Sequence, residues 1–252
     1  MSCTLGVLAF GDSITNGGGE LQWGVALQSW ALWVARGLGL PFTSYAVDGA
    51  RAAHVVEQQI PAFLARSAHP DARYELGCLY IGVNDVRAPD WDETRFAGCY
   101  ARALEFLGRR CERTLALTAP VDLGRPRAGA KVQALNTSIE REAARAGARV
   151  VDLRDFGGRE LVMADRVHPT ALGQVEIAER ALAVLARDGV RVAVRPSELV
   201  SYRTTATGRL RGDARYAYRI LRAYADGGLA LVRSALRQRS TPRTGPALRA
   251  TR

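Results

Sequence analysis

The stretch LGVLAFGDSIT, residues 5–15, decides the fold class and introduces the first candidate functional residue. Its first six residues form an apolar run broken only by a glycine, which is typical of a strand buried on both faces. Gly11 and Asp12 end the run, and Ser13 follows at the carboxyl end of the expected strand. Open α/β sheets bind their ligands at that end of their strands, so Ser13 is the first candidate site residue.

Four further apolar runs follow, and they alternate with amphipathic stretches. We expect strands at residues 5–10, 43–47, 76–82, 114–119 and 148–153, and helices at residues 23–38, 50–65, 92–111, 130–146 and 170–187. Such alternation predicts a parallel sheet covered by helices on both faces, a three-layer α/β/α domain with a central parallel five-stranded sheet. In the common strand order 2-1-3-4-5, the second and third strands flank the first.

The composition is that of a globular protein with one substantial core. The chain has 252 residues, of which 48% are hydrophobic, and no run of apolar residues is long enough to cross a membrane. Its four cysteines are widely spaced and form no CxxC pair, so we predict free thiols rather than a zinc site or a disulfide framework. The N-terminus carries no secretory leader pattern, and we therefore expect a cytoplasmic protein.

The net charge of +10 is concentrated at the C-terminal end of the chain. From residue 195 onward there are 13 arginines and 3 acidic residues, whereas the first 194 residues hold 22 basic and 22 acidic ones. We divide the chain accordingly into a neutral α/β domain, residues 1–194, and a basic C-terminal extension, residues 195–252. Within the extension we predict amphipathic helices over about residues 213–236 and a disordered end.

A serine hydroxyl becomes a nucleophile when a base accepts its proton and a third group orients that base. The chain offers three histidines. His54 falls within an expected helix and His69 in a polar connection, so we interpret both as structural or solvated residues. His168 lies between the last strand and the last helix, three residues after Asp165. That carboxylate can accept the Nδ1 proton and leave Nε2 for Ser13, although the spacing taken alone favours a simpler reading, an acid at a helix N-terminus.

A reaction at Ser13 would also need hydrogen-bond donors for the negative charge that develops on the substrate oxygen. Gly49 follows the second expected strand and can present its backbone N–H, while Asn84 follows the third and can present its side-chain amide. The backbone N–H of Ser13 would be the third donor. Each residue taken alone fits a simple turn, but their joint occurrence at consecutive strand ends favours a site.

Taken together, these segments resemble the four sequence blocks of the SGNH/GDSL hydrolases. The blocks are GDSIT at residues 11–15, a glycine at residue 49, GVND at residues 82–85 and DRVHP at residues 165–169. They occur in the family's order and cover about residues 5–190. One departure is local: Ser44 and Tyr45 stand where the second block often opens with an asparagine.

The resemblance implies a flavodoxin-like fold and a serine esterase or lipase-like enzyme that uses neither metal nor cofactor. It assigns Ser13 as the nucleophile, His168 as the general base and then acid, and Asp165 as the carboxylate that orients the imidazole. The oxyanion hole would consist of the N–H groups of Ser13 and Gly49 and the amide of Asn84. A small-molecule acyl ester is the expected substrate, and the loops around residues 87–91 and 121–127 are expected to shape its pocket.

Two other functions remain open from the sequence. The same site could pass the acyl group to an alcohol or a sugar, which would make the protein an acyltransferase. Alternatively, the basic extension could make the chain a binder of anionic membrane surfaces or nucleic acid, with a vestigial hydrolase body. We favour an anionic membrane surface or self-association over nucleic acid as the partner of the extension.

Overall fold

The computed structural model describes residues 5–20, 22, 25–66 and 72–200, together with the isolated positions 214, 218, 221 and 222. The predictions for Cys3 and His69 lie outside these residues. So do those for the C-terminal extension beyond residue 200, apart from the four isolated positions, which are helical.

Five parallel strands form one sheet, as the alternation of strands and helices predicts. The strands are β1 (Val7–Gly11), β2 (Phe42–Ser44), β3 (Tyr74–Tyr80), β4 (Cys111–Leu117) and β5 (Arg149–Val151). Their order is β2-β1-β3-β4-β5, and all neighbouring pairs are parallel. β2 and β3 therefore flank β1, and the carboxyl ends of all three strands lie at the same edge of the sheet.

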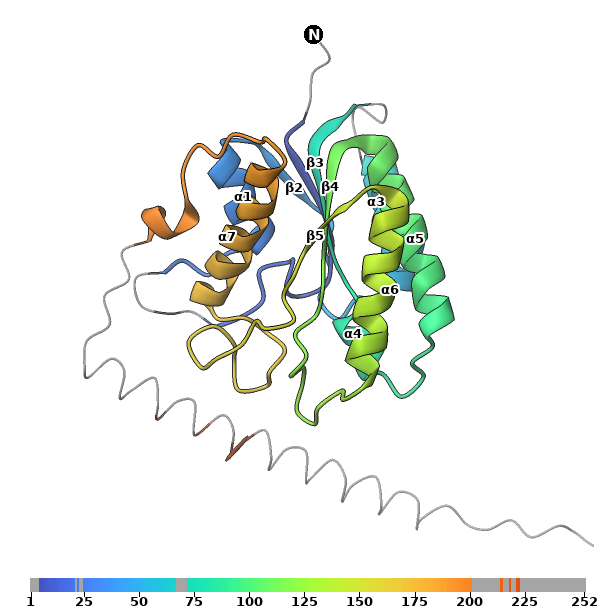
Figure 1. The fold of residues 1–252 in the computed structure, drawn as a ribbon, viewed down its shortest axis with the longest axis vertical. Helices are drawn as coiled ribbons and strands as arrows, with labels where there is room; N and C mark the ends of the chain where they lie inside the picture. Colours follow the sequence, from blue (N-terminus) through green and yellow to red (C-terminus); the bar gives the residue numbers. More distant parts are fainter. Residues whose placement is uncertain are drawn as a thin grey trace, which may run out of the picture.

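Helices cover both faces of the sheet and give the three layers of a flavodoxin-like fold (Figure 1). One face carries α1 (Trp30–Leu38) and α7 (Ala171–Arg187). The other carries α2 (Ala52–His54), the π-helical segment η1 (Val55–Gln59), α3 (Ile60–Arg66), α5 (Glu93–Arg110) and α6 (Lys131–Ala146). The short helix α4 (Val83–Arg87) follows β3 at the carboxyl edge, where the long loops after the strands also lie.

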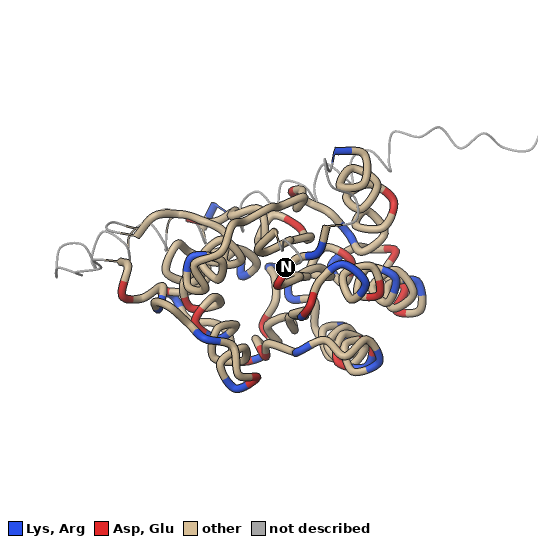
Figure 2. The backbone as a smooth tube through the Cα atoms, turned by 90° about the horizontal axis from the view of Figure 1, so that it is seen from above, with Lys and Arg blue, Asp and Glu red and all other residues tan. Residues whose placement is uncertain are grey.

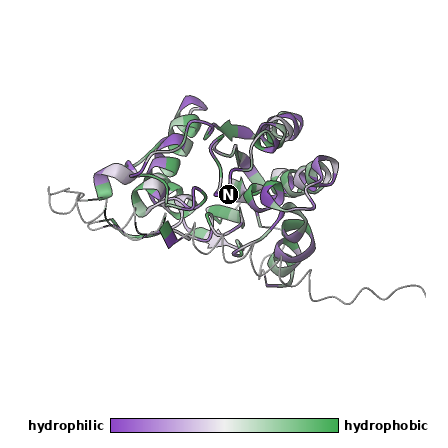
Figure 3. Cartoon of the chain, turned by 90° about the horizontal axis from the view of Figure 1, so that it is seen from below, coloured by the Kyte–Doolittle hydropathy of each residue, from purple (hydrophilic) through white to green (hydrophobic). Residues whose placement is uncertain are grey.

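The core lies between the sheet and its two helix layers. The apolar residues of β1 are fully buried, and β3 and β4 are buried over most of their length, as continuous apolar runs predict. Apolar residues gather on the sides of the helices that face the sheet, while polar residues gather on the outer sides (Figure 3). The sheet is therefore a rigid platform on which the loops at its carboxyl edge are mounted.

Several predicted boundaries differ from the structure by a few residues, and two of these differences lie close to the strand that carries Ser13. The helix expected from residue 23 begins at Trp30, because the Ser29 hydroxyl accepts a hydrogen bond from the N–H of Ala31 and caps the helix there. The second strand pairs only as far as Ser44. Beyond it the chain still donates to β1, from the N–H of Tyr45 to Ala9 and from that of Val47 to Gly11, and then turns toward α2.

The chain packs on the domain as far as residue 200. The N–H groups of Ala193 and Val194 donate to the carbonyl of Gly37 on α1. The 3₁₀ helix η2 (Pro196–Leu199) is then tied to α7, because Glu179 accepts from the backbone and hydroxyl of Ser197. None of the helices in the described ranges is both long and apolar enough to span a membrane.

Candidate active site

Ser13 lies in a tight turn immediately after β1. The N–H of Ile14 donates to the Oδ1 atom of Asp12 at 3.0 Å, and the N–H of Gly18 donates to the carbonyl of Ser13 at 2.7 Å. These bonds fold the chain back on itself directly after the strand. The serine is thereby presented at the carboxyl edge of the sheet, as predicted.

The turn requires a residue without a side chain at position 11. A Cβ atom there would lie 2.5 Å from Oγ1 of Thr15 and 2.6 Å from the carbonyl oxygen of Tyr80. Gln59 holds both polar groups of Gly11, because its amide donates to the glycine carbonyl at 2.7 Å and its oxygen accepts from the glycine N–H at 3.1 Å. The strand end that carries Ser13 is thus fixed by its backbone as well as by packing.

His168 meets Ser13 across 155 residues of sequence. The distance between Oγ of Ser13 and Nε2 of His168 is 2.9 Å, and Nδ1 of His168 lies 2.7 Å from Oδ2 of Asp165. The geometry fits a hydroxyl that donates to Nε2 and an Nδ1–H that donates to the carboxylate. The structure therefore brings together the three side chains that the sequence singled out as nucleophile, base and orienting acid.

The two carboxylate oxygens of Asp165 accept hydrogen bonds from different donors. Oδ1 accepts from the backbone N–H groups of Val167 and His168, while Oδ2 accepts from the imidazole. The carboxylate therefore orients the histidine and also holds the turn before α7. It does not cap the helix, as the alternative reading of the spacing expected, because the N-cap of α7 is Thr170, whose hydroxyl accepts from the N–H of Gly173. The turn also needs a left-handed backbone at Arg166, whose φ angle is +54° and whose guanidinium pairs with Asp122.

The electrostatics of the pair suit proton transfer. The hydrogen bond to Asp165 raises the pKa of His168 and outweighs the opposing effect of burial. Burial disfavours the ionised form of Asp165, but its hydrogen bonds from His168 and two backbone N–H groups outweigh that effect and lower its pKa. The carboxylate is therefore charged at neutral pH, and the imidazole is a stronger base than free histidine.

Gly49 lies in the loop after β2 and Asn84 in the first turn of α4, directly after β3, on either side of the serine turn. The amide of Asn84 donates to the carbonyl of Ala50 at 3.0 Å, and the amide of Asn16 donates to Asp48 at 2.9 Å. Gly49 adopts a φ angle of +73°, which a glycine accommodates without strain. The three loops are thus tied to one another, and the two predicted oxyanion donors belong to the loops that flank Ser13.

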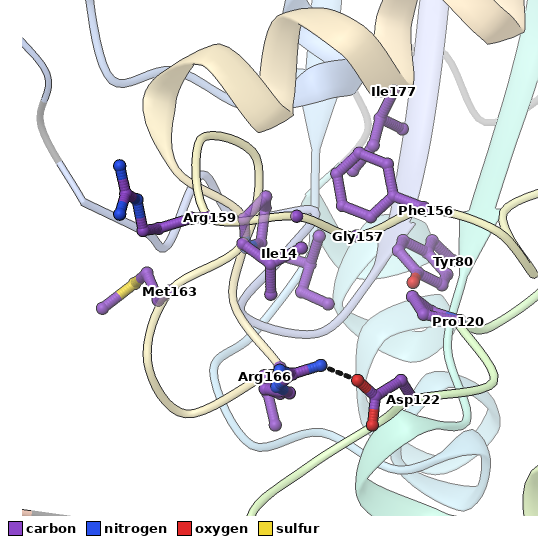
Figure 4. Close-up of a pocket in the computed structure, with 14 residues that line it drawn as sticks. Ile14, Tyr80, Pro120, Asp122, Phe156, Gly157, Arg159, Met163, Arg166 and Ile177 are labelled. Atoms are coloured by element: carbon purple, nitrogen blue, oxygen red, sulfur yellow. Dashed lines mark ion pairs between the residues drawn. The ribbon is translucent and has the colours of Figure 1, made fainter. Parts of the chain in front are cut away.

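Two hollows adjoin the site. A cavity of about 70 Å³ is lined by residues next to Ser13 and His168, namely Ile14, Val167 and Pro169. In Figure 4, Phe156, Tyr80 and Pro120 border it on one side and Met163 and Arg159 on the other, with the Arg166–Asp122 ion pair beside them. A larger polar groove of about 440 Å³ runs past Gly49 and includes Arg51, Asp90 and Trp91. The loops around residues 87–91 and 121–127 each contribute to one of these hollows, as expected.

Several buried side chains that support the site were not identified from the sequence. Gln174 on α7 is fully buried, donates to the carbonyls of Ile14 and Gly18 and accepts from the N–H of Trp30. Asp85 accepts from the N–H of Ala52 and so holds the start of α2. Gln and Asp are common on surfaces, and their spacing along the chain gives no sign that these particular residues are buried. His54 is structural, as predicted, since its Nδ1 accepts from the N–H of Arg51.

Comparison with known families decides the assignment. The model of the GDSL-like lipase/acylhydrolase family matches residues 9–175, which include every predicted site residue. The chain belongs to the GDSL-like lipase/acylhydrolase family. As a GDSL-family protein it is placed among the esterases and acylhydrolases, which agrees with the resemblance noted from the four sequence blocks.

Solved structures support the fold of this GDSL-family chain. A member of the lipolytic G-D-S-L family from Veillonella parvula is 23% identical, with a TM-score of 0.57 over 72% of this chain and 98% of that one. A catalytic mutant of an acetylxylan esterase from Geobacillus stearothermophilus is 18% identical, with a TM-score of 0.57 over 76% and 99% of the two chains. A search of curated proteins gave no match.

Proposed function

We propose that the protein is a serine esterase that works through a covalent acyl-enzyme. Ser13 attacks the ester carbonyl as its proton passes to Nε2 of His168, and the imidazolium then protonates the departing alcohol. Water next attacks the acyl-enzyme with His168 again as base, releasing the acid and restoring Ser13. The observation that carries the proposal is the unbroken hydrogen-bonded path from Ser13 through His168 to Asp165.

The oxyanion of each tetrahedral intermediate is assigned to three donors: the N–H groups of Ser13 and Gly49 and the amide of Asn84. Asn84 has a second amide proton beyond the one it gives to Ala50, so it retains a donor for the substrate. The loops that hold Gly49 and Asn84 are fixed before substrate binds. Fixed donors need little reorganisation during the reaction, and one such donor typically contributes roughly a hundredfold to a thousandfold in turnover.

The preferred acyl group is short, such as acetyl or butyryl. A cavity of about 70 Å³ is lined by Ile14 and Val167, the sequence neighbours of Ser13 and His168. A single water molecule needs about 10–15 Å³ of space measured in this way, so the cavity has room for only a few heavy atoms. The similar acetylxylan esterase from Geobacillus stearothermophilus acts on an acetyl ester by its description, which agrees with this preference.

The decisive variant is Ser13→Ala, measured with nitrophenyl esters from acetate to decanoate. We expect the wild type to cleave the shortest esters with the highest kcat/KM and the variant to lose all turnover while keeping its circular dichroism spectrum. Ser44→Ala, which removes an exposed hydroxyl at the end of β2, is the matched control and should remain active. Undiminished activity of folded Ser13→Ala would refute the assignment of the nucleophile.

Product analysis separates the esterase from an acyltransferase. Chromatography of the products formed in the presence of an added alcohol or sugar shows whether water or that acceptor takes the acyl group. We expect the free acid to dominate. A transferred ester as the main product at low acceptor concentration would keep Ser13 as the nucleophile but replace hydrolysis by acyl transfer.

A further inference from the structure

The carboxyl group of Asp12 is buried directly beneath the serine turn. Its residue has no exposed surface, and Oδ1 accepts from the N–H of Ile14. The other oxygen, Oδ2, is buried and has no hydrogen-bond partner in the described part of the chain. A carboxylate in such a place costs stability, because the charge has lost its water and gained only one hydrogen bond.

A purely structural role for Asp12 would not require a negatively charged side chain. The bond from Ile14 uses an oxygen that an asparagine would also supply, and a neutral amide would be cheaper to bury. The charged or titratable groups that face the carboxyl come from three different segments of the fold. They are His168 before α7, Asp85 on α4 and Tyr80 at the end of β3.

Of these neighbours, His168 is the one that can carry positive charge. The charges of Asp12 and His168 influence the pKa of each other. Burial raises the pKa of Asp12 to about 7, with Asp85 acting in the same direction and His168 opposing it. Asp165 and Asp12 favour the imidazolium form of His168, and Arg87 opposes it. Asp12 and His168 therefore titrate over the same pH range and influence each other.

We propose that Asp12 is a positioning residue of the catalytic centre whose negative charge stabilises the imidazolium that His168 becomes when it takes the proton of Ser13. The role rests on the proposed esterase function. Asp12 neither bonds to the substrate nor exchanges a proton with it. It supplies a fixed charge behind the turn, while Asp165 holds the imidazole by a hydrogen bond on the other side.

The consequence is a two-group dependence of activity on pH. Above neutral pH Asp12 is charged, and the transfer of the proton from Ser13 to His168 is favoured. As the pH falls, Asp12 takes up a proton at the same time as His168, so catalysis is lost over a range that belongs to both groups. The acidic limb of the pH–activity profile lies above the pH at which an unperturbed histidine titrates, because the pKa of His168 is raised.

The test is Asp12→Asn, which keeps the acceptor for Ile14 and removes the charge. The titration of His168 is followed by NMR in the full chain, and kcat/KM for nitrophenyl acetate is measured from pH 5 to 9. We expect the His168 titration and the acidic limb of the pH profile to move to lower pH by roughly one unit, because the removed charge favours the imidazolium form. We also expect kcat/KM at pH 8 to fall by about tenfold.

Asp188→Asn is the matched control, because it removes one carboxylate from the C-cap of α7, where it pairs with Arg149. It should leave the His168 titration unchanged. An unchanged His168 titration in folded Asp12→Asn would overturn the proposal. If Asp12→Asn does not fold, the carboxyl carbon of Asp12 is titrated by NMR in the wild type, and a carboxyl signal that shows no inflection at the pH where His168 titrates would overturn it.

The same titrations in a Ser13→Ala background keep this proposal separate from the esterase assignment. Coupling between Asp12 and His168 is then observed without turnover. Activity that survives Ser13→Ala would remove the proposed function, whereas loss of coupling with Ser13 still essential would remove the role of Asp12 alone.

Discussion

At the scale of single residues, the chemistry depends on how carboxylates are placed around one imidazole. Asp165 is half-exposed and bonds both to the backbone of its own turn and to His168. Asp12 is fully buried, touches the turn of Ser13 and leaves one oxygen unpaired. The first therefore fixes the orientation and tautomer of the base, and the second acts through its charge.

Replacing Asp165 by asparagine tests the first of these roles. The amide can still cap the turn through its oxygen, but it can also donate to Nδ1 and so favour the wrong tautomer of His168. We expect kcat to fall roughly a thousandfold or more, as in other triads, with little change in the melting temperature. Asp155→Asn, which removes an exposed carboxylate that pairs with Arg180 on α7, is a comparison that should keep its activity. Near-normal activity of Asp165→Asn would mean that another group orients His168.

At the scale of elements, the site is an assembly of loops held by buried amides. Gln59 from η1 fixes the end of β1, and Gln174 from α7 fixes the loop that follows Ser13. Asn84 joins the loops after β2 and β3. Side chains from helices on both faces of the sheet thus hydrogen-bond to the segments at its carboxyl edge that carry the reactive groups.

Gln174→Leu is the sharpest test of this support. The leucine fills the space but leaves the carbonyls of Ile14 and Gly18 and the N–H of Trp30 without their partner. A buried polar group left unpaired costs about 1–3 kcal/mol, so we expect the urea midpoint to fall clearly and kcat to fall with it. Gln133→Leu, at an exposed position on α6, is the control and should change neither. A fully stable and active Gln174→Leu protein would contradict the role of this side chain.

Sequence patterns predicted the strands and the residues that meet at Ser13, because apolar runs and strand-end motifs are local features. The strand order is the common one for doubly wound folds, and no local pattern specifies it. Two kinds of detail could not be predicted from sequence patterns. The start of α1 depends on a cap at Ser29 rather than on the apolar pattern, which continues upstream of it. The buried contacts of Gln59, Gln174 and Asp12 depend on tertiary packing, which makes polar residues from distant segments neighbours.

At the scale of the whole molecule, the domain and the basic extension differ in charge. Basic and acidic residues are interspersed along the backbone of the described domain (Figure 2). The excess of positive charge belongs to the sequence after residue 194. Since the core cluster and the predicted site residues described above lie within residues 5–200, catalysis is expected not to depend on the rest of the chain.

A chain that ends after Val200 tests this separation. We expect its kcat/KM for nitrophenyl acetate to equal that of the full chain. Only the full chain should sediment with phosphatidylserine vesicles, since each arginine near an anionic surface contributes about 1 kcal/mol. Binding should disappear at 1 M salt, where the Debye length is about 3 Å. Equal sedimentation of both chains, or of neither, would contradict the membrane role, and a concentration-dependent mass of the full chain alone would indicate self-association instead.

The most direct test of the account is the site of covalent labelling by a fluorophosphonate, which reacts only with an activated serine. Mass spectrometry of the digested protein should find one adduct per chain, on Ser13, and the labelling rate should collapse in His168→Asn. An adduct on another serine, or ester hydrolysis by a chain whose Ser13 stays unlabelled, would contradict the claim that His168 activates Ser13.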